Sequence, residues 1–167
     1  MNPLFEDWKN EGHSKKESNH STLKLVSQVP SSEFYPFLVE THKQTFTEID
    51  CLQCANCCKT IPPIIVKTDI KRIAGILGLS KKQFIRKYIL EDVDGEMTFN
   101  GVPCKFLESD NSCRIYDIRP EACRRYPHTD EKEFQKRVSF NIENTIICPA
   151  AFNIVGKINK HFLSDGL

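Results

Sequence analysis

Residues 51–58 read CLQCANCC and place four cysteines within eight positions. Thiols that are two residues apart can turn back onto one ion, because the backbone between them curls and directs its N–H groups at the sulfurs. The adjacent Cys57 and Cys58 project in different directions, so this pair suits two centres better than one. The stretch predicts a fold that is organised around bound metal.

Four further cysteines follow at wider spacing along the chain. Together they give a set of eight that we predict as metal ligands: Cys51, Cys54, Cys57, Cys58, Cys104, Cys113, Cys123 and Cys148. Cys148 directly precedes Pro149 at a predicted helix start, where unpaired N–H groups and the helix dipole stabilise a thiolate. The later cysteines are therefore expected to meet the first cluster in space.

The eight thiols can be divided between two predicted sites. A triplet with two-residue spacing and a remote Cys-Pro pair is typical of ferredoxin clusters, and it indicates the first group: Cys51, Cys54, Cys57 and Cys148. In a predicted hairpin, Cys104 and Cys113 lie diagonally on one face, so they join the second group. That group is Cys58, Cys104, Cys113 and Cys123.

The kind of metal follows less directly from the residues. Ligation by thiolates alone suits both zinc and iron–sulfur centres. Ferredoxin spacing, together with the lack of a second CxxC pair outside residues 51–58, favours an iron–sulfur cofactor, as one or two 4Fe–4S clusters, with Zn2+ as the alternative. Because a thiolate-bound centre is anionic, we expect Arg119 and Arg124 to bind beside the cofactor and offset its charge.

Composition narrows the class of protein. The chain has 167 residues, a net charge of +1 and 40% hydrophobic residues, which is typical of a globular protein. The first 18 residues contain no apolar signal core, and no run approaches the ~20 apolar residues of a membrane helix. We therefore expect a cytoplasmic location, where thiols stay reduced, and a redox or protein partner rather than a membrane or nucleic acid.

Hydrophobic periodicity and turn signals predict an α+β fold. We expect a small, mainly helical metal-binding domain with a short antiparallel β-meander, organised around the eight cysteines, over residues 31–167. Residues 1–30 are predicted to form a partly ordered N-terminal arm. The meander should occupy residues 96–116 and turn at Asn100-Gly101, after a buried strand at residues 64–66. The predicted helices run over residues 32–47, 68–77, 80–90 and 148–162, with a short one that begins at Pro120.

Three functions fit these features. The first is an iron–sulfur protein for electron transfer or redox sensing, and the second is a structural zinc domain for protein interaction. The third is DNA binding through residues 69–88, where the spacing of Ala74 and Gly78 resembles a helix-turn-helix. The sequence has no GxSxG, HExxH or glycine-rich phosphate loop, so catalytic residues are unknown and an iron–sulfur oxidoreductase is an open alternative.

Two sequence blocks also resemble the YkgJ-type cysteine-cluster family, known for its CxxCxxCC zinc- or iron-chelating domain. The first block is residues 51–58, and the second is residues 113–127, which read CRIYDIRPEACRRYP. The second block meets every fixed position of the pattern C-x-I-Y-x-x-R-P-x-x-C-R-x-[FY]-P. Cys104 and Cys148 occupy the remaining cysteine positions, and the resemblance covers about residues 45–155. It implies metal binding by eight thiols.

Overall fold

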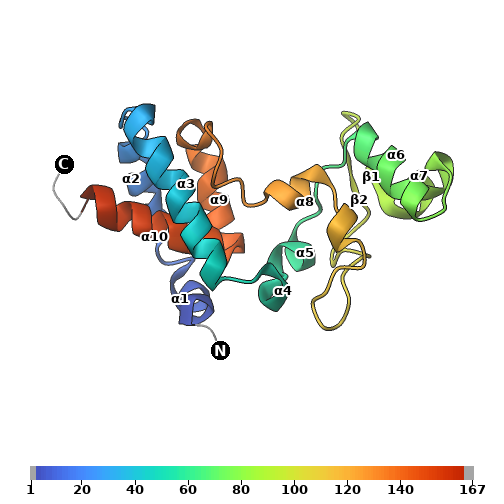
Figure 1. Ribbon diagram of the computed structural model, residues 1–167, viewed down its shortest axis with the longest axis horizontal. Coiled ribbons are helices and arrows are strands. Elements are labelled where there is room, and N and C mark those ends of the chain that lie inside the picture. Colours follow the sequence, from blue (N-terminus) through green and yellow to red (C-terminus); the bar gives the residue numbers. More distant parts are fainter. Residues whose placement is uncertain (1–2, 164–167) are drawn as a thin grey trace. The chain divides into compact units, whose positions relative to one another are not determined.

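The computed structural model describes residues 3–163, which form mainly helices (Figure 1). The chain divides into two compact units: unit 1 comprises the residues up to Cys51 and those from Pro127 onward, and unit 2 comprises Leu52–Tyr126. Unit 1 contains α1 (Pro3–Glu11), α2 (Lys16–Val26), α3 (Ser31–Glu48), the 3-10 helix η2 (Phe134–Lys136), α9 (Val138–Ile147) and α10 (Pro149–Leu163). Unit 2 contains α4 (Cys51–Cys54) except for its first residue, Cys51, which belongs to unit 1. The other elements of unit 2 are α5 (Asn56–Thr60), α6 (Lys67–Ile76), α7 (Lys81–Tyr88), β1 (Ile89–Glu91), β2 (Met97–Phe99), η1 (Tyr116–Ile118) and α8 (Glu121–Arg125).

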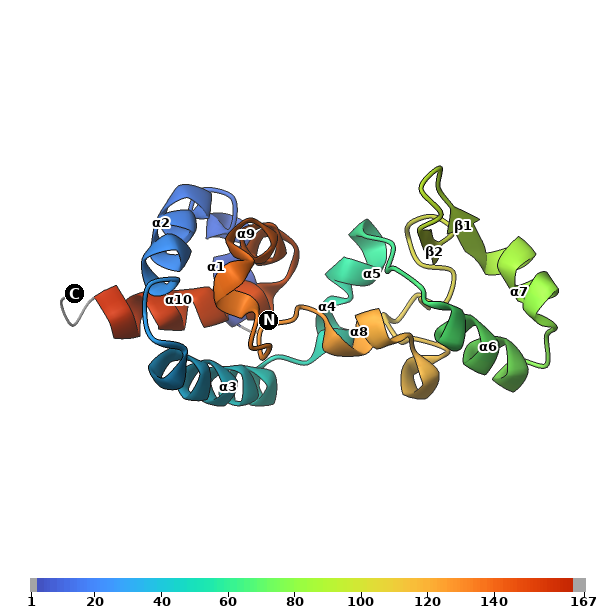
Figure 2. The same cartoon turned by 90° about the horizontal axis from the view of Figure 1, so that it is seen from above.

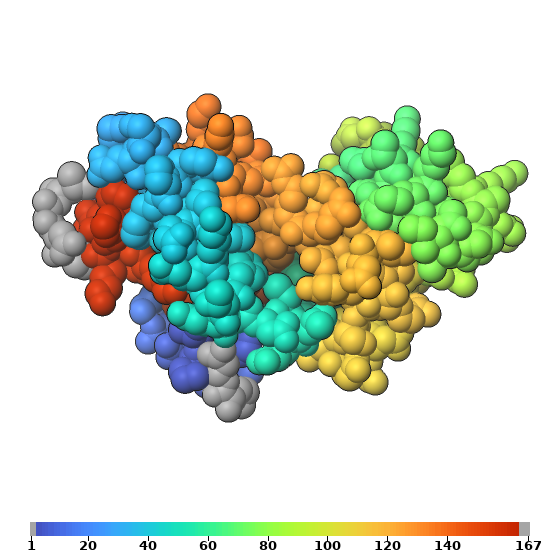
Figure 3. Space-filling model, viewed as in Figure 1, coloured from blue at the N-terminus to red at the C-terminus, as the bar shows by residue number. Residues whose placement is uncertain are grey.

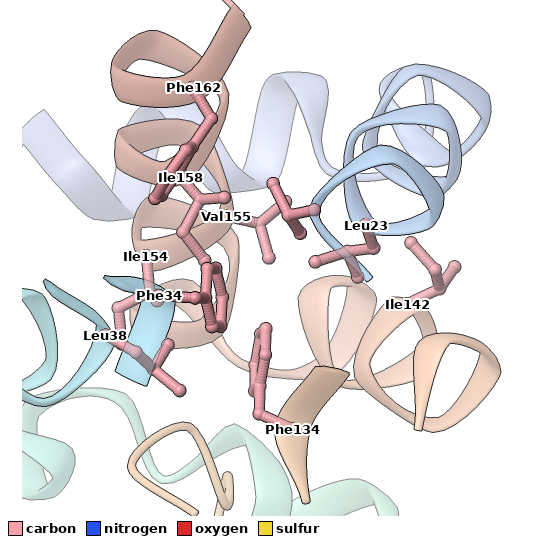
Figure 4. Packing of buried hydrophobic residues seen from close by; sticks show 10 residues of the cluster. Leu23, Phe34, Leu38, Phe134, Ile142, Ile154, Val155, Ile158 and Phe162 are labelled. Carbon is pink, nitrogen blue, oxygen red and sulfur yellow. The ribbon is translucent and has the colours of Figure 1, made fainter. Parts of the chain in front are cut away.

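The core of unit 1 is a bundle of aliphatic and aromatic side chains (Figure 4). The ring of Phe34 on α3 lies 5.9 Å from that of Phe134 and 5.6 Å from that of Phe162. Leu23 of α2 and Ile158 of α10 are also fully enclosed. Burial of such side chains contributes about 1.5–3 kcal/mol each, so this core holds α2, α3 and α10 together.

The N-terminal residues take part in this bundle. Leu23 and Val26 lie in the core, and Asn159 donates a hydrogen bond of 2.6 Å to the Thr22 hydroxyl. The buried residues of α2 are Asn19, Thr22, Leu23 and Val26, which recur at helical spacing and so form one buried face. The predicted division into an arm at residues 1–30 and a domain at residues 31–167 therefore does not coincide with the two units.

Most of the predicted helices are present with nearly the predicted ends. The helix expected at residues 32–47 is α3, and its Pro36 lies at the sixth position, inside the helix, where it has no N–H to donate to the Ser32 carbonyl. Ser80 caps α7 in a capping box with Gln83. Sequence analysis did not predict α9, because its buried positions include Asn141, Asn144 and Thr145, which hide the apolar period.

The sheet of unit 2 corrects the predicted β-meander. In the described residues it is a two-stranded antiparallel sheet, in which Ile89 pairs with Phe99 and Glu91 with Met97. The turn between the strands is residues 92–96, where an Asp92 carboxylate oxygen accepts the N–H groups of Asp94 and Glu96. The predicted hairpin at Asn100-Gly101 is wrong, since these residues follow the last strand.

The rest of the predicted meander is reduced to one isolated antiparallel bridge, between Leu107 and Cys113. The buried strand predicted at residues 64–66 is also wrong, because only Ile64 forms a bridge, with Thr98, and Ile64 and Val66 are each 50% exposed. Pro103 has no N–H to donate to a ladder, so the segment after Gly101 cannot continue the sheet. The α+β class is still correct, with helices predominating.

The helical hairpin α6–α7 packs beside this sheet (Figures 1 and 2). Ile70 and Ile73 of α6 and Phe84 of α7 are fully buried with Phe99 of β2 and Phe106. This second cluster forms the core of unit 2. Of the helices between residues 3 and 163, none combines the length and the apolar character that crossing a membrane requires.

Candidate metal centre

The first cysteine cluster folds into two short helices that meet at a sharp turn. Cys54 ends α4 and Cys57 and Cys58 lie on α5, with the buried Ala55 between the helices at a φ of 49°. This left-handed conformation reverses the backbone direction. The helix α5 that follows is held by N–H groups of Lys59 and Ile61, which donate to the carbonyls of Ala55 and Cys57. The CxxC spacing thus produces the curled backbone that it predicts.

Backbone contacts bring the segment from Cys104 to Cys113 against α5. The Cys104 N–H donates to the Cys58 carbonyl at 2.8 Å. The Asn111 side-chain amide reaches the Gln53 carbonyl at 3.5 Å. Because Leu107 pairs with Cys113, the two ends of this segment are held near each other. These contacts join two parts of unit 2 that lie about fifty residues apart in sequence.

An ion pair between the buried Asp69 and the partly exposed Arg72 fixes the third contributing segment. Asp69 is 5% exposed, and its carboxylate accepts Arg72 Nη2 at 2.7 Å and the Glu121 N–H at the start of α8 at 3.0 Å. Arg72 also donates to the carbonyls of Ile118 and Arg119. The pair therefore ties α6 to the segment that carries Arg119 and to the helix that carries Cys123.

Four thiols of unit 2 lie close enough to influence one another electrostatically. Burial raises the pKa of Cys123 to about 12, with further increases from Cys58, Cys104 and Cys113. Burial likewise raises the pKa of Cys104 and that of Cys113, and the neighbouring Cys58 contributes to both. These four residues are free thiols, and they are the second group of the predicted partition.

Cys58 differs from its three neighbours. The pKa of Cys58 is lowered to about 7 by a hydrogen bond from the Cys57 side chain and, to a lesser extent, by the charges of Lys59 and Arg119, against the opposing effect of burial. A thiolate is the metal-binding form of cysteine. Cys58 is therefore the thiol of this group that ionises first as the pH rises.

The two arginines predicted beside the cofactor have different surroundings. The Arg119 guanidinium stacks 3.8 Å from the centre of the Tyr116 ring, and its charge lowers the pKa of Cys58, Cys113 and Cys123. Arg124 instead forms an ion pair with Glu121 on the same helix. Contact of either arginine with a bound cofactor stays a prediction.

The remaining predicted ligands are distributed over both units. Cys54 and Cys57 belong to unit 2, whereas Cys51 and Cys148 belong to unit 1. Cys148 lies between α9 and α10, and its carbonyl accepts the Phe152 N–H at 3.0 Å. Cys148 thus lies directly before the first residue of α10, as the sequence predicts. All eight cysteines are at least partly accessible to solvent.

The donor set fits a thiolate-bound metal in chemistry, although the thiols are not yet gathered around one point. Within residues 3–163, no three His, Cys, Asp or Glu side chains are positioned to hold a metal ion. Cysteine reaches other staggered rotamers by one rotation about its Cα–Cβ bond. Ligation by Cys58, Cys104, Cys113 and Cys123 would therefore require side-chain rotation around a backbone that already holds the four residues near one another.

Sequence analysis missed the two residues that position this group. Asp69 and Arg72 are far in sequence from the cysteines of residues 113–127. In the sequence, both look like ordinary charged residues on the surface of a helix. The available signal was that Asp69 precedes Ile70 and Ile73 on the buried side of α6. A carboxylate there needs a partner, and Arg72 is three residues away.

Comparison with known proteins assigns the chain to a family. Residues 50–140 match the family described as "CxxCxxCC: Putative zinc- or iron-chelating domain", and the chain belongs to this family. The matched residues contain seven of the eight cysteines, all except Cys148. The family supports metal binding by this chain without distinguishing iron from zinc.

One relative comes from the archaeon Methanocaldococcus jannaschii. This uncharacterized protein is 32% identical over 82 residues, which cover 47% of this chain and 44% of the relative. The match thus spans less than half of the relative's length. No solved structure matches the chain.

Proposed function

We propose that this protein binds an iron–sulfur cluster through its cysteines and transfers electrons in the reducing cytoplasm. The observation that carries the proposal is the convergence of Cys58, Cys104, Cys113 and Cys123, in which the Cys104 N–H donates to the Cys58 carbonyl at 2.8 Å and Cys58 raises the pKa of the other three thiols. All four are thiols, and thiolates are the usual ligands of iron–sulfur clusters. The family description, a zinc- or iron-chelating domain, supports the metal.

The residues around the four thiols suit such a centre. When bound, an iron–sulfur cluster supplies one-electron redox chemistry at a potential that charge, hydrogen bonds and solvent exposure set. The Arg119 charge offsets part of the negative charge of the thiolates. Partial burial of the cysteines limits the access of water, and the Asp69–Arg72 pair keeps Arg119 and Cys123 in place.

A structural zinc site is the second candidate. Four thiolates from three chain segments are a complete ligand set for structural zinc, and such sites contribute folding free energy directly. The short helices and the single bridge of residues 100–126 are the kind of weakly regular structure that a bound ion stabilises. In this alternative the domain serves protein contacts and has no redox role.

Anaerobic purification with metal analysis separates the two candidates. We expect brown protein with broad absorbance near ~400 nm and with iron and acid-labile sulfide. Cys123→Ser should reduce the bound iron, whereas Ala122→Ser, a change of similar size at the preceding position, should retain it. Colourless protein with stoichiometric zinc would favour the structural candidate, and protein with no metal after anaerobic purification would contradict both.

A further inference from the structure

The formal charge of the chain is divided unevenly between the two units. Residues 52–126 contain thirteen Lys and Arg against nine Asp and Glu, whereas the remainder contains ten against thirteen. The net charge of +1 for the whole chain therefore conceals a basic unit 2 and an acidic unit 1. Local charge, rather than net charge, determines where a polyanion would bind.

The positive charge of unit 2 is concentrated on α6 and α7. Residues 67–88 contain seven cationic side chains and a single carboxylate, Asp69, which is buried and bonded to Arg72. Six exposed cations remain: Lys67, Lys71, Lys81, Lys82, Arg86 and Lys87. Among the described residues, none of these six forms an ion pair with a carboxylate. Figure 3 shows this segment, in green, at the surface of unit 2.

The two helices present these charges in a defined geometry. They are joined by a four-residue turn in which Gly78 adopts a φ of 67°, a conformation that favours glycine. Phe84 and Tyr88, one turn apart on α7, face the core. Lys82 and Arg86, also one turn apart, are exposed and lie on the opposite side of the helix.

We infer that α7 is the DNA-contacting helix of a helix-turn-helix, and that it binds the major groove of duplex DNA. The four-residue turn with its glycine matches the turn of this motif, in which the second helix lies in the groove. An α-helix with its side chains is about 10–12 Å in diameter, so it fits the major groove, which is about 12 Å wide.

The competing partner is an acidic protein, and the charge pattern argues against it. Ile76 and Leu77 are exposed at the turn, which would suit a protein surface. However, residues 67–88 contain no exposed carboxylate, and a segment whose exposed charges are all positive matches the uniform charge of a phosphate backbone. The inference does not depend on which metal the cysteines bind.

The test is fluorescence anisotropy with the full metal-loaded chain and a labelled 20-base-pair duplex of mixed sequence, at several salt concentrations. We expect binding whose logarithm falls linearly with the logarithm of the salt concentration. The triple variant Lys81→Gln/Lys82→Gln/Arg86→Gln should weaken binding and reduce the magnitude of this slope by about 2 to 3.

A matched control has the same net charge as that triple variant, because it also loses three cations. Lys24→Gln/Lys43→Gln/Lys136→Gln removes three exposed cations of unit 1 and should leave affinity and slope unchanged. Circular dichroism and metal content verify that both variants are folded. The inference is overturned by absence of binding to the duplex at low salt, by equal loss in the two triple variants, or by tighter binding to a poly-glutamate probe than to the duplex.

Discussion

At the scale of single residues, the adjacent Cys57 and Cys58 are the most informative pair. Two neighbouring thiols would ordinarily have similar acidity, yet here one donates a hydrogen bond to the other. The acceptor, Cys58, is stabilised as a thiolate, because a hydrogen bond to the charged form of a group favours that form. The doublet thus supplies one thiol that is ready to bind metal near neutral pH.

The acidity of Cys58 can be tested in reduced, metal-free protein. Because its pKa is lowered to about 7, its reaction with iodoacetamide should rise through pH 7 and level off above it. Cys123, whose burial raises its pKa to about 12, should remain protonated and slow throughout pH 6–9. Peptide mapping by mass spectrometry after short labelling pulses measures both rates.

Two variants identify the cause of this acidity. Cys57→Ala removes the largest contribution and should move the Cys58 midpoint to higher pH. Arg119→Gln removes a smaller one and should move the midpoint less in the same direction. Arg86→Gln, on the exposed side of α7, is the control and should leave the midpoint in place. A midpoint that is insensitive to Cys57→Ala would contradict the hydrogen-bond explanation.

At the scale of elements, local signals predicted helices better than strands. Ser80 and Gln83 form a capping box within four residues, so the start of α7 could be predicted from the sequence. The β-hairpin was placed wrongly because two turn signals compete within ten residues. The Asp92 side chain satisfies the backbone of residues 92–96, and this turn prevails over Asn100-Gly101.

The contact between α6 and α8 gives a prediction at the same scale. Asp69→Asn retains the size of the side chain and removes the charge that pairs with Arg72. The loss of a buried charge-assisted hydrogen bond should lower the free energy of unfolding by about 1–3 kcal/mol, measured by urea denaturation.

A control for this variant lies nearby on η1. Asp117→Asn removes an exposed carboxylate and should change the free energy of unfolding by less than about 0.5 kcal/mol. Equal destabilisation by Asp69→Asn and Asp117→Asn would show that the buried pair does not hold the two helices together. The metal content of Asp69→Asn should fall as well, since Cys123 lies on α8.

At the scale of the whole molecule, the two units differ in what stabilises them. Unit 1 has an aromatic and aliphatic core in which Phe34, Phe134 and Phe162 meet. Unit 2 has a separate core and contains six of the eight cysteines. Metal that binds these thiols adds its binding free energy to the folding of unit 2.

Removal of the metal should therefore destabilise unit 2 more than unit 1. The single tryptophan, Trp8, donates to the Thr145 carbonyl at 3.0 Å, so its fluorescence reports on unit 1. After chelation we expect only a small shift of the thermal transition that Trp8 fluorescence reports. The amide-exchange protection of α6 and α7 should fall strongly. Equal loss in both units would show that the metal stabilises them as one cooperative structure.

The sequence by itself determined the cysteine motif, the family and the helices whose caps and periodicity are local. Backbone propensities and capping act within a few residues, so they can be read without the rest of the chain. Only the tertiary structure decided that Cys58, Cys104, Cys113 and Cys123 influence one another, and that Asp69 and Arg72 hold α8. It also showed that the chain has two units whose charges differ in sign. These features depend on contacts between residues far apart in sequence, and such contacts are fixed by packing and burial rather than by local preference.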